Sequence, residues 1–491
     1  MSIISRDTSG GMHLARVSIK DLAIPDDILV LILEMLDSTS ASNLLPELVI
    51  ASHIAHQWRE VAIHTGSLWS DIAVSSNHSP HMITAYLSRS KQYPLQITYE
   101  CPDIPSESLY WSVESAMMPT WGLLLAECHR WQSLAVLCFC KLSSKAFDEL
   151  VQSLRPLSAP CLQSLIVDSD NHDYRLDRKN WVIRPGGLGA NPGPTQAAFT
   201  GGAPALKSWK MRYLPPTYCY PPAARLTELS VHVHPWQTPM EYSDFRELLT
   251  TACHLERLSL HGRPLGMAVI SPDPIIPIQL VRLRYLDVDA YFDSQAYNGA
   301  YVHAVFSTIA APHLETLIFT SNGQAPATEA FLELTQNGGS FPKLHTLCLS
   351  EIQSTLITPT FMRSTPNIRK LTLLSLFEDH STLMQPLEDP ECLWPCLQDL
   401  SVEAPFGLRL CELVAARVEM GHPIRSLHMN EYLTHIYDVG PDFKTKLEWL
   451  RENVELDTNF NAVGQPISTN EDASDPFTEA FHSDEALEEV F

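Results

Sequence analysis

The pattern of apolar and polar positions is clearest between Ile24 and Leu36, where it predicts a helix that is apolar on more than one side. Pro25 suits the first turn of a helix, because its missing N–H has no intrahelical partner there. Asp26 and Asp27 follow, and their negative charge favours the positive end of the helix dipole. Apolar residues then recur at helical spacing in two adjacent stripes, made of Ile28, Ile32 and Leu36 and of Leu29 and Leu33.

Further apolar segments follow this helix before residue 70. They consist of Leu44, Leu45 and Leu48, then Ile54 and Trp58, then Leu68 and Trp69. Each is too short to form a stable helix alone, because isolated short helices are marginal in water. The pattern therefore predicts a module of three short helices that needs a partner to cover its apolar surface.

The segment from Ile24 to Trp69 resembles an F-box, the module that docks a substrate receptor onto the Skp adaptor of a cullin–RING ubiquitin ligase. The family pattern reads Leu-Pro-x-Glu-Ile-Leu-x-x-Ile-Phe-x-x-Leu, then Leu-Leu, then Val-Cys-x-x-Trp, then Leu-Trp. Four mild replacements separate this sequence from that pattern, at Ile24, Asp27, Leu33 and Ala55. The connection between Leu36 and Leu44 is also longer than usual. The resemblance implies adaptor binding by Ile24, Pro25, Ile28, Leu29, Ile32, Leu33, Leu36, Leu44, Leu45, Leu48, Ile54 and Trp58.

Beyond residue 70 the sequence repeats an apolar frame of the form L-x-x-L-x-L with conservative replacements. The frames begin at Trp131, Leu162, Leu206, Leu226, Leu255, Leu283, Leu314, Leu344, Ile368, Leu397 and Ile424. From Leu226 onward they follow one another at intervals of 24 to 31 residues, a period that indicates a solenoid or array. The last two apolar residues of each frame have the spacing of one strand face. Helix-like stretches lie between frames, for example from Asp244 to Thr251.

One strand and one helix in each unit predict an α/β fold, a solenoid with a parallel inner sheet and outer helices. The region resembles the irregular leucine-rich repeats that follow F-boxes in fungal proteins, although the usual Asn or Cys after the strand is not regularly present. Leu68 to Val74 and Pro94 to Tyr99 resemble degenerate first units. The positions between the last two frame residues should line the concave face. These are Lys210, Ser230, Ser259, Asp287, Ile318, Cys348, Thr372, Ser401 and His428, a mostly small set with little charge.

Aromatic residues gather in the loops after several of the predicted strands. Exposed aromatic side chains are common anchors in protein interfaces. We therefore expect target binding at Trp236, Tyr291, Phe292 and Phe377.

The sequence divides into a flexible leader at 1–20, the F-box-like segment at 21–69, the irregular repeats at 70–452 and an acidic tail at 453–491. The tail has ten acidic residues and no Lys or Arg, so we expect disorder there. A Gly- and Pro-rich insertion at about 184–204 interrupts the repeats. It is either a tolerated surface loop or a loop that binds a ligand.

The formal net charge of −24 argues against a nucleic-acid-binding surface, because phosphate contacts are made by Lys and Arg. No apolar run reaches the ~18 residues of a membrane span, and residues 1–20 lack the apolar core of a signal peptide. The eleven cysteines lack disulfide-framework or zinc spacing, which indicates reduced thiols in the cytoplasm, the nucleus or both. We expect no metal, cofactor, nucleic acid or membrane partner.

An enzyme remains an alternative, because strand–helix units also build a (β/α) barrel. His232 and His234 follow a predicted strand and could be metal ligands of a barrel hydrolase, although two exposed loop histidines explain them more simply. Eleven frames are too many for one barrel, and no Gly-x-Ser-x-Gly or His-Glu-x-x-His motif occurs. We therefore expect no catalytic residues.

The sequence favours the substrate-recognition subunit of an SCF-type (cullin–RING) ubiquitin ligase, which binds an unknown target protein and performs no chemistry itself. A second hypothesis is a leucine-rich-repeat scaffold that binds proteins without a role in ubiquitination. The two differ only in the F-box, so binding of the Skp-family adaptor separates them.

Overall fold

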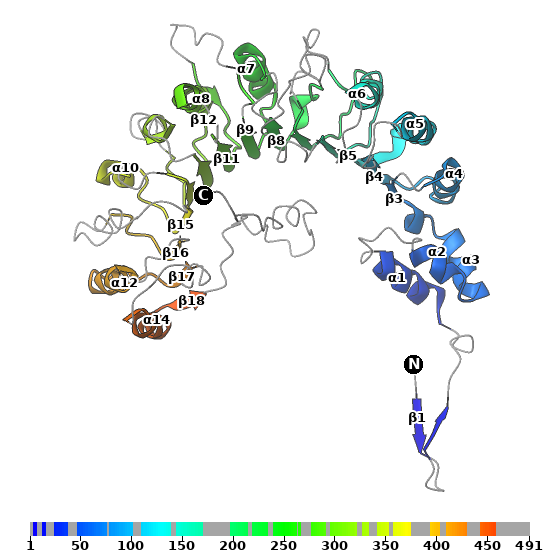
Figure 1. The fold of residues 1–491 in the computed structure, drawn as a ribbon, viewed down its shortest axis with the longest axis horizontal. Coiled ribbons are helices and arrows are strands. Elements are labelled where there is room, and N and C mark those ends of the chain that lie inside the picture. Colours follow the sequence, from blue (N-terminus) through cyan, green and yellow to red (C-terminus); the bar gives the residue numbers. More distant parts are fainter. Residues whose placement is uncertain are drawn as a thin grey trace, which may run out of the picture. The chain divides into compact units, whose positions relative to one another are not determined.

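The structure is a computed structural model of the chain (Figure 1). It describes residues 3–6, 12–15, 24–37, 47–75, 78–101, 110–138, 144–169, 197–214, 219–233, 239–262, 264–266, 276–290, 295–321, 327–332, 341–352, 357–374, 393–402, 409–429 and 442–457. The chain divides into two compact units, Met1–Lys343 and Leu344–Phe491. Each unit is described by itself below.

A cluster of short helices follows the N-terminal residues of the first unit. It consists of α1 (Asp26–Asp37), α2 (Glu47–Ser52), α3 (His56–His64) and the 3₁₀ helix η2 (Gly66–Trp69). Leu29 and Leu33 of α1, Ala51 of α2 and Val61 of α3 are all buried. The predicted three-helix arrangement is therefore present, and α1 buries one of its two predicted stripes.

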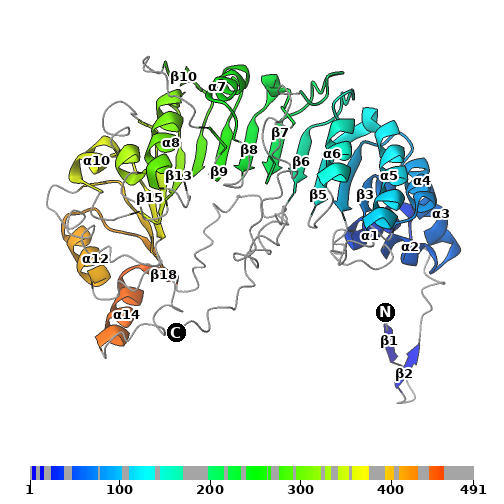
Figure 2. The same cartoon turned by 45° about the horizontal axis from the view of Figure 1, so that its top comes forward.

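The rest of the first unit is a parallel sheet with helices between its strands. The strands are β3 (Asp71–Val74), β4 (Leu95–Cys101), β5 (Trp131–Cys138), β6 (Ser164–Asp168), β7 (Ser208–Arg212), β8 (Glu228–Val233), β9 (Arg257–Gly262), β11 (Tyr285–Asp289) and β13 (Thr316–Thr320). The helices are α4 (Pro80–Arg89), α5 (Tyr110–Ala126), η4 (Cys128–Arg130), α6 (Ser144–Ser153), η7 (Ala223–Arg225), α7 (Tyr242–Thr251) and α8 (Gln295–Thr308). The α-helices lie on one side of the strands (Figures 1 and 2).

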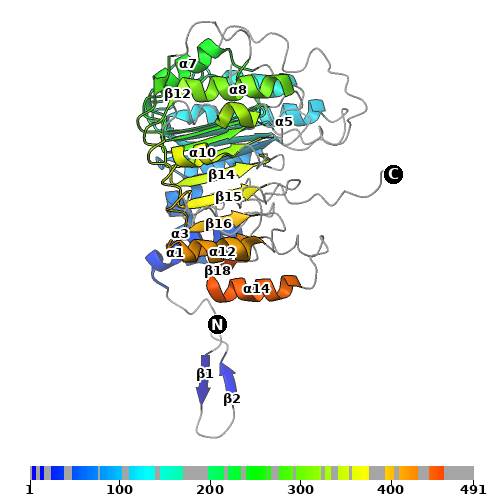
Figure 3. The same ribbon diagram turned by 90° about the vertical axis from the view of Figure 1, so that its left-hand side faces the viewer.

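The second unit continues the same alternation of strand and helix. Its elements are β14 (Thr346–Ser350), α10 (Pro359–Ser364), β15 (Lys370–Leu374), β16 (Asp399–Val402), α12 (Arg409–Glu419), β17 (Ser426–Met429), α14 (Asp442–Asn453) and β18 (Glu455–Asp457). Its strands are parallel neighbours in chain order (Figure 3). The fold is thus a mixed α/β protein, and the sheet that these units build contains 14 parallel strands.

The register of the sheet confirms the predicted repeat frame. Leu258, Leu286 and Leu317 are aligned across β9, β11 and β13, and each is at most 1% exposed. The next apolar positions of these strands, Leu260, Val288 and Phe319, are aligned and buried in the same way. In the second unit the first apolar positions of the four strands are aligned with one another, as are the second ones, and all are buried. The two positions are, strand by strand, Leu347 and Leu349, Leu371 and Leu373, Leu400 and Val402, and Leu427 and Met429. Burying one such side chain contributes roughly 1.5–3 kcal/mol.

The two degenerate units predicted before residue 100 are also present as strands. Ile72 of β3 is aligned with Ile97 of β4, which is aligned with Leu134 of β5. Val74 and Tyr99 occupy the next apolar position and are buried. The repeating arrangement therefore begins directly after η2.

A ladder of main-chain hydrogen bonds joins successive repeats just before their strands. The carbonyl oxygen of the residue after the first frame Leu accepts hydrogen bonds from two main-chain N–H groups of the next repeat. Thr227 O, for example, accepts from Glu256 N at 2.7 Å and Arg257 N at 2.9 Å. The same pair of hydrogen bonds is accepted by the carbonyl oxygens of Gln163, Lys207, Glu256, Arg284, His345, Arg369 and Gln398. Because the backbone provides this ladder, the stacking does not depend on a particular side chain.

A buried alanine precedes five of the eleven frames by three positions, and sequence reasoning missed it. The frame Leu donates its N–H to the carbonyl of that residue, as Leu226 does to Ala223 at 3.1 Å. The residues in this position are Ala159, Ala203, Ala223, Ala252 and Ala311, all buried. An Ala-x-x-Leu spacing in the sequence is the signal that predicts this turn.

Gly262 ends β9 where only glycine fits. Its φ is +67°, and a Cβ placed on it would lie 1.9 Å from the main-chain oxygen of Val233 on the neighbouring strand. Any side chain at this position would strain the backbone and push the two strands apart.

The structure differs from the predicted boundaries at both ends. Within the predicted leader, β1 (Ile3–Arg6) pairs antiparallel with β2 (Met12–Ala15). At the other end, α14 and β18 extend the ordered repeats to Asp457, beyond the predicted start of the tail at 453. Residues 458–491 lie outside the described residues.

A second small sheet pairs β10 (Ile278–Gln279) with β12 (Ile309–Ala310).

Candidate functional site

An exposed apolar surface lies on α1 and α2, within the F-box-like segment. Ile28, Leu31 and Met35 of α1 are 44%, 55% and 72% exposed, and Ile50 and Ile54 are 53% and 43% exposed. Among the described residues only nine large hydrophobic side chains are this exposed, and five of them lie here. Ile28, Leu31 and Met35 are spaced i, i+3 and i+7, so they share one helix face. We call these five residues the α1–α2 apolar face.

The structure divides the predicted adaptor-binding residues into two groups. Leu29 and Leu33 are fully buried, so they hold the helices together and offer no surface to a partner. Pro25, Ile28 and Ile54 are exposed, whereas Ile24, Ile32 and Trp58 are half-buried. Leu36 and Leu48 belong to α1 and α2 but their side chains lie outside the description, as do residues Leu44 and Leu45 entirely.

Leu31, Met35 and Ile50 were not among the predicted contact residues. The family pattern marks Leu31 as a variable position, and it therefore drew no attention. The signal was nevertheless present, because a helix with apolar residues on several sides can bury only part of them within a three-helix module.

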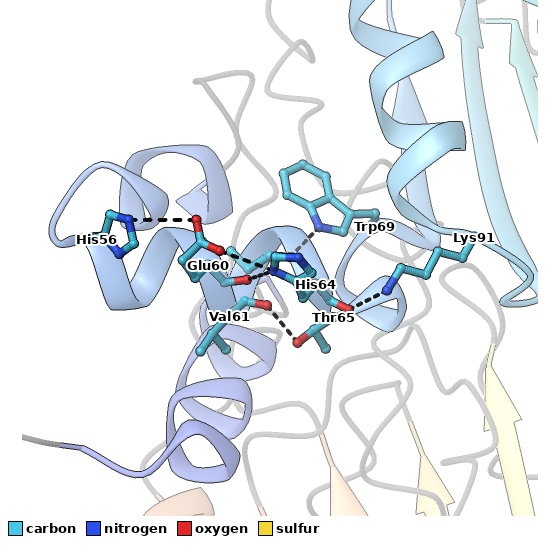
Figure 4. A network of polar contacts seen from close by, with 8 residues as sticks. His56, Glu60, Val61, His64, Thr65, Trp69 and Lys91 are labelled. Carbon is cyan, nitrogen blue, oxygen red and sulfur yellow. Dashed lines mark hydrogen bonds and ion pairs between the residues drawn. The ribbon is translucent and has the colours of Figure 1, made fainter.

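Polar contacts fix α3 against the start of α1. The side-chain amide nitrogen of Gln57 donates to Ile24 O at 2.8 Å and to Asp26 Oδ1 at 2.9 Å. The bond satisfies a main-chain carbonyl at the point where α1 begins. On the exposed side of α3, Glu60 lies between His56 and His64, at 4.0 Å and 3.6 Å (Figure 4).

Trp69 joins the helices to the first repeat. Its side chain is 1% exposed, and its indole N–H donates to Ala62 O of α3 at 2.6 Å (Figure 4). The ring packs on Tyr86 of α4, with centroids 5.1 Å apart, and the Arg89 guanidinium lies 4.4 Å from its centroid. Lys91 adds a second link, since its ammonium donates to His64 O at 2.7 Å. The helical module is therefore packed onto the sheet and not merely tethered to it.

A network of charged and aromatic side chains covers the sheet face opposite the core in the first unit. Arg212 of β7 pairs with Asp168 of β6 at 3.3 Å, and Lys210 pairs with Glu228 of β8 at 3.3 Å. His261 of β9 pairs with Asp287 of β11 at 3.1 Å. We call the residues Asp168, Lys210, Arg212, Tyr213, Glu228, His232, Arg257, His261, Tyr285 and Asp287 the charged sheet face.

This network corrects two expectations about the face. It is not poor in charge, because charged side chains also occupy positions two residues before or after the predicted concave-face residues, as Arg212, Glu228 and His261 do. His232 is not an exposed loop residue, because it belongs to β8, is half-buried and has its ring 4.4 Å from that of Tyr213 and 5.6 Å from that of His261. In the second unit three of the predicted concave-face residues, Cys348, Thr372 and Ser401, are buried.

His261 is held in its charged form. Burial alone would lower the pKa of this imidazole, but the carboxylates of Asp287 and Asp289 outweigh it, while Arg212 opposes them, and the pKa rises to about 9. An imidazolium is therefore present on the sheet face at neutral pH.

The pKa of His261 predicts a pH-dependent contribution to stability. Because the folded pKa lies above the ordinary value, the contribution is fully present below pH ~6.5 and is lost as the pH rises through about 9. The His261→Gln variant should be less stable than the parent by roughly 1.5–3 kcal/mol at pH 6, the value of a hydrogen bond to a charged group. The difference should vanish above the raised pKa. Urea unfolding of both proteins across this range measures it, and a difference that grows with pH would contradict the assignment.

The predicted target-binding aromatics lie outside the described residues, namely Trp236, Tyr291, Phe292 and Phe377, as does His234. The Gly- and Pro-rich insertion at about 184–204 is described only from 197 onward. There Phe199 is buried, and Ala159 donates to Gly202 O at 2.9 Å, so this end of the insertion packs on the repeats.

The described residues give no group of three His, Cys, Asp or Glu side chains arranged to hold a metal ion. Nine cysteines are described, all free thiols, of which four are buried. Burial raises the pKa of the Cys219 thiol to about 12, so it is not a thiolate nucleophile. Among the described helices, none has both the length and the apolarity needed to cross a bilayer.

The order of the described strands bears on the barrel alternative. From β3 to β13 each strand pairs with its neighbours in one linear series, which is an open sheet and not a closed eight-stranded barrel. The metal-dependent barrel hydrolase is therefore not supported by the fold.

Comparison with known proteins gives no family model and no curated protein that matches this sequence. The interpretation of both surfaces therefore depends on their residues and geometry.

Proposed function

We propose that this protein is a substrate receptor of an SCF-type cullin–RING ubiquitin ligase, in which residues 24–69 form an F-box and the repeats form a leucine-rich-repeat solenoid. The observation that carries the proposal is the α1–α2 apolar face. It occurs in the segment whose residues resemble the family pattern, and it is formed by the helices that the resemblance assigns to the Skp-family adaptor.

The composition of the apolar face supports a protein partner. Contiguous exposed apolar surface on a folded protein marks an interaction site, because it costs free energy to leave it in water. Ile28, Leu31 and Met35 present aliphatic side chains on one helix face, which suits a groove between helices of a partner.

The packing around Trp69 supports the division of roles between the two parts. A receptor must hold its target near the ligase, and a module that packs onto the first repeat transmits position better than a flexible tether. The indole hydrogen bond to Ala62 and the tilted ring contact with Tyr86 provide such a connection.

The repeats carry the second half of the proposal, which is binding of a target protein. In this view no residue of the chain performs chemistry, and the protein needs neither metal nor cofactor. A repeat scaffold without a ligase role is the competing hypothesis, favoured by the fact that the charged sheet face is complete without the helices.

Affinity purification of the chain from its host cells, followed by mass spectrometry, tests the proposal. Peptides of a Skp-family adaptor and of a cullin are expected in the eluate together with target proteins. Recovery of target proteins without adaptor or cullin would favour the scaffold hypothesis and exclude the ligase role.

A further inference from the structure

The charged sheet face is asymmetric in the exposure of its ion pairs. Arg212 is 17% exposed whereas its partner Asp168 is 1% exposed. His261 is 31% exposed and Asp287 13%, and Lys210 is 34% exposed and Glu228 29%. In all three pairs the cation is the more accessible member, so an incoming group meets positive charge first.

A fourth cation extends this pattern on the same face. The exposed Arg257 of β9 stacks over the buried side chain of Tyr285, with its guanidinium carbon 4.0 Å from the ring centroid. Arg257 lies four residues before His261 on β9, and it is aligned with Glu228 in the register of β8 and β9. The stacking holds the guanidinium in place, so that less entropy is lost when it binds a ligand.

Aromatic rings connect the cations across the strands. Arg212 lies 5.6 Å from the Tyr213 ring centroid, and the rings of Tyr213, His232 and His261 follow one another at 4.4 Å and 5.6 Å. Aromatic and Arg side chains together are the usual composition of strong interface contacts.

We propose that the charged sheet face binds an acidic peptide segment of the target protein, whose Asp or Glu carboxylates pair with Lys210, Arg212, Arg257 and His261. The inference deepens the proposed function, because it names the class of target that the repeats would select. It concerns the sheet alone, so it stands or falls independently of adaptor binding.

The difference in exposure explains how a chain with a net charge of −24 can attract an acidic partner. Asp168 is buried and Asp287 is only 13% exposed, whereas their partners Arg212 and His261 are more accessible, so a ligand carboxylate meets these cations at the surface. Asp289 is half-buried beside His261 and belongs to the same underlying layer of negative charge. His261 stays protonated at neutral pH and therefore contributes as a cation.

The test uses the full chain and a fluorescein-labelled peptide of alternating Glu and Ser, titrated by fluorescence anisotropy at low and at physiological ionic strength. A matched peptide with Gln in place of Glu is the first control. The Glu peptide is expected to bind, more weakly as salt rises, and the Gln peptide is not. Failure of the Glu peptide to bind would overturn the proposal.

Variants locate the binding surface. Combined replacement Lys210→Gln and His261→Gln should weaken binding at least about tenfold, whereas Arg284→Gln should not, because Arg284 is an exposed arginine paired with Glu315 just before β11. Glu228→Gln frees Lys210 from its partner and should tighten binding, which a loss of folding would not produce. Equal binding by the double variant would overturn the proposal. A phosphoserine peptide that binds when the Glu peptide does not would also overturn the proposal, because the ligand would then be a phosphate and not a carboxylate.

Discussion

Replacing Leu31 with Asp is expected to weaken adaptor binding at least about tenfold while leaving the chain folded. Leu31 is 55% exposed at the centre of the α1–α2 apolar face, so the chain alone loses little when it changes. A leucine that becomes buried in a complex contributes roughly 1.5–3 kcal/mol, and about 1.4 kcal/mol corresponds to a tenfold change in affinity. A buried, unpaired carboxylate adds a further cost. Surface plasmon resonance with purified adaptor measures the change.

Val418→Asp is the matched control for Leu31→Asp. Val418 lies on α12 of the second unit and is 53% exposed, so the same kind of substitution is made at the same exposure but far along the chain from α1. This variant should bind the adaptor like the parent. If Leu31→Asp retained full affinity, the α1–α2 apolar face would not be the contact surface, even if the adaptor itself still bound.

Replacing Trp69 with Ala is expected to destabilise the first unit by ~3–5 kcal/mol, the usual cost of removing a buried Trp. The indole is buried and contacts α3 and α4, and its loss removes the ring contact with Tyr86 together with the hydrogen bond to Ala62. Domains of this kind are stable by only ~5–15 kcal/mol, so the thermal transition should fall by several degrees. Differential scanning calorimetry measures this shift.

Trp69→Phe separates the contribution of the ring from that of its N–H group. Phenylalanine keeps an aromatic ring against Tyr86 but cannot donate to Ala62 O, so we expect a smaller loss of about 1–3 kcal/mol from the unsatisfied carbonyl. An Ala variant as stable as the parent would show that Trp69 does not join the helices to the repeat.

The repeat frame could be predicted from the sequence because burial on a parallel strand imposes a strict alternation. Leu258 and Leu260 must face the same side, and a one-residue shift would expose both. The frame therefore determined the register across β8, β9, β11 and β13, and the structure agrees at every aligned position. The helix-like stretch predicted from Asp244 to Thr251 corresponds to α7, which begins two residues earlier at Tyr242.

The charged sheet face could not be predicted in the same way. Its ion pairs join residues on different strands that are 18 to 44 positions apart in sequence, such as Lys210 with Glu228 and Arg212 with Asp168. Pairing across strands depends on which positions of each strand carry charge, and the frame predicts only one concave-face position in each strand. His261 illustrates this, because its partner Asp287 was among the predicted concave-face residues, whereas His261 follows the last apolar residue of its frame, Leu260, and was not.

The contact surface of the helical module could be predicted only in part. Periodicity identified α1 and its two stripes but not which stripe faces its own core, because both are apolar. The structure assigns Leu29 and Leu33 to the core and leaves Ile28 exposed. Packing of α2 and α3 on α1 determines which stripe is buried, and the sequence of α1 alone does not predict that packing.

Isothermal titration calorimetry of the full chain with a purified Skp-family adaptor is the decisive test of the proposed ligase role. We expect a one-to-one complex with a negative heat-capacity change, because the α1–α2 apolar face leaves water when the partner binds. Absence of binding to the adaptor, by a chain that is folded and keeps its calorimetric unfolding transition, would contradict the proposed ligase role.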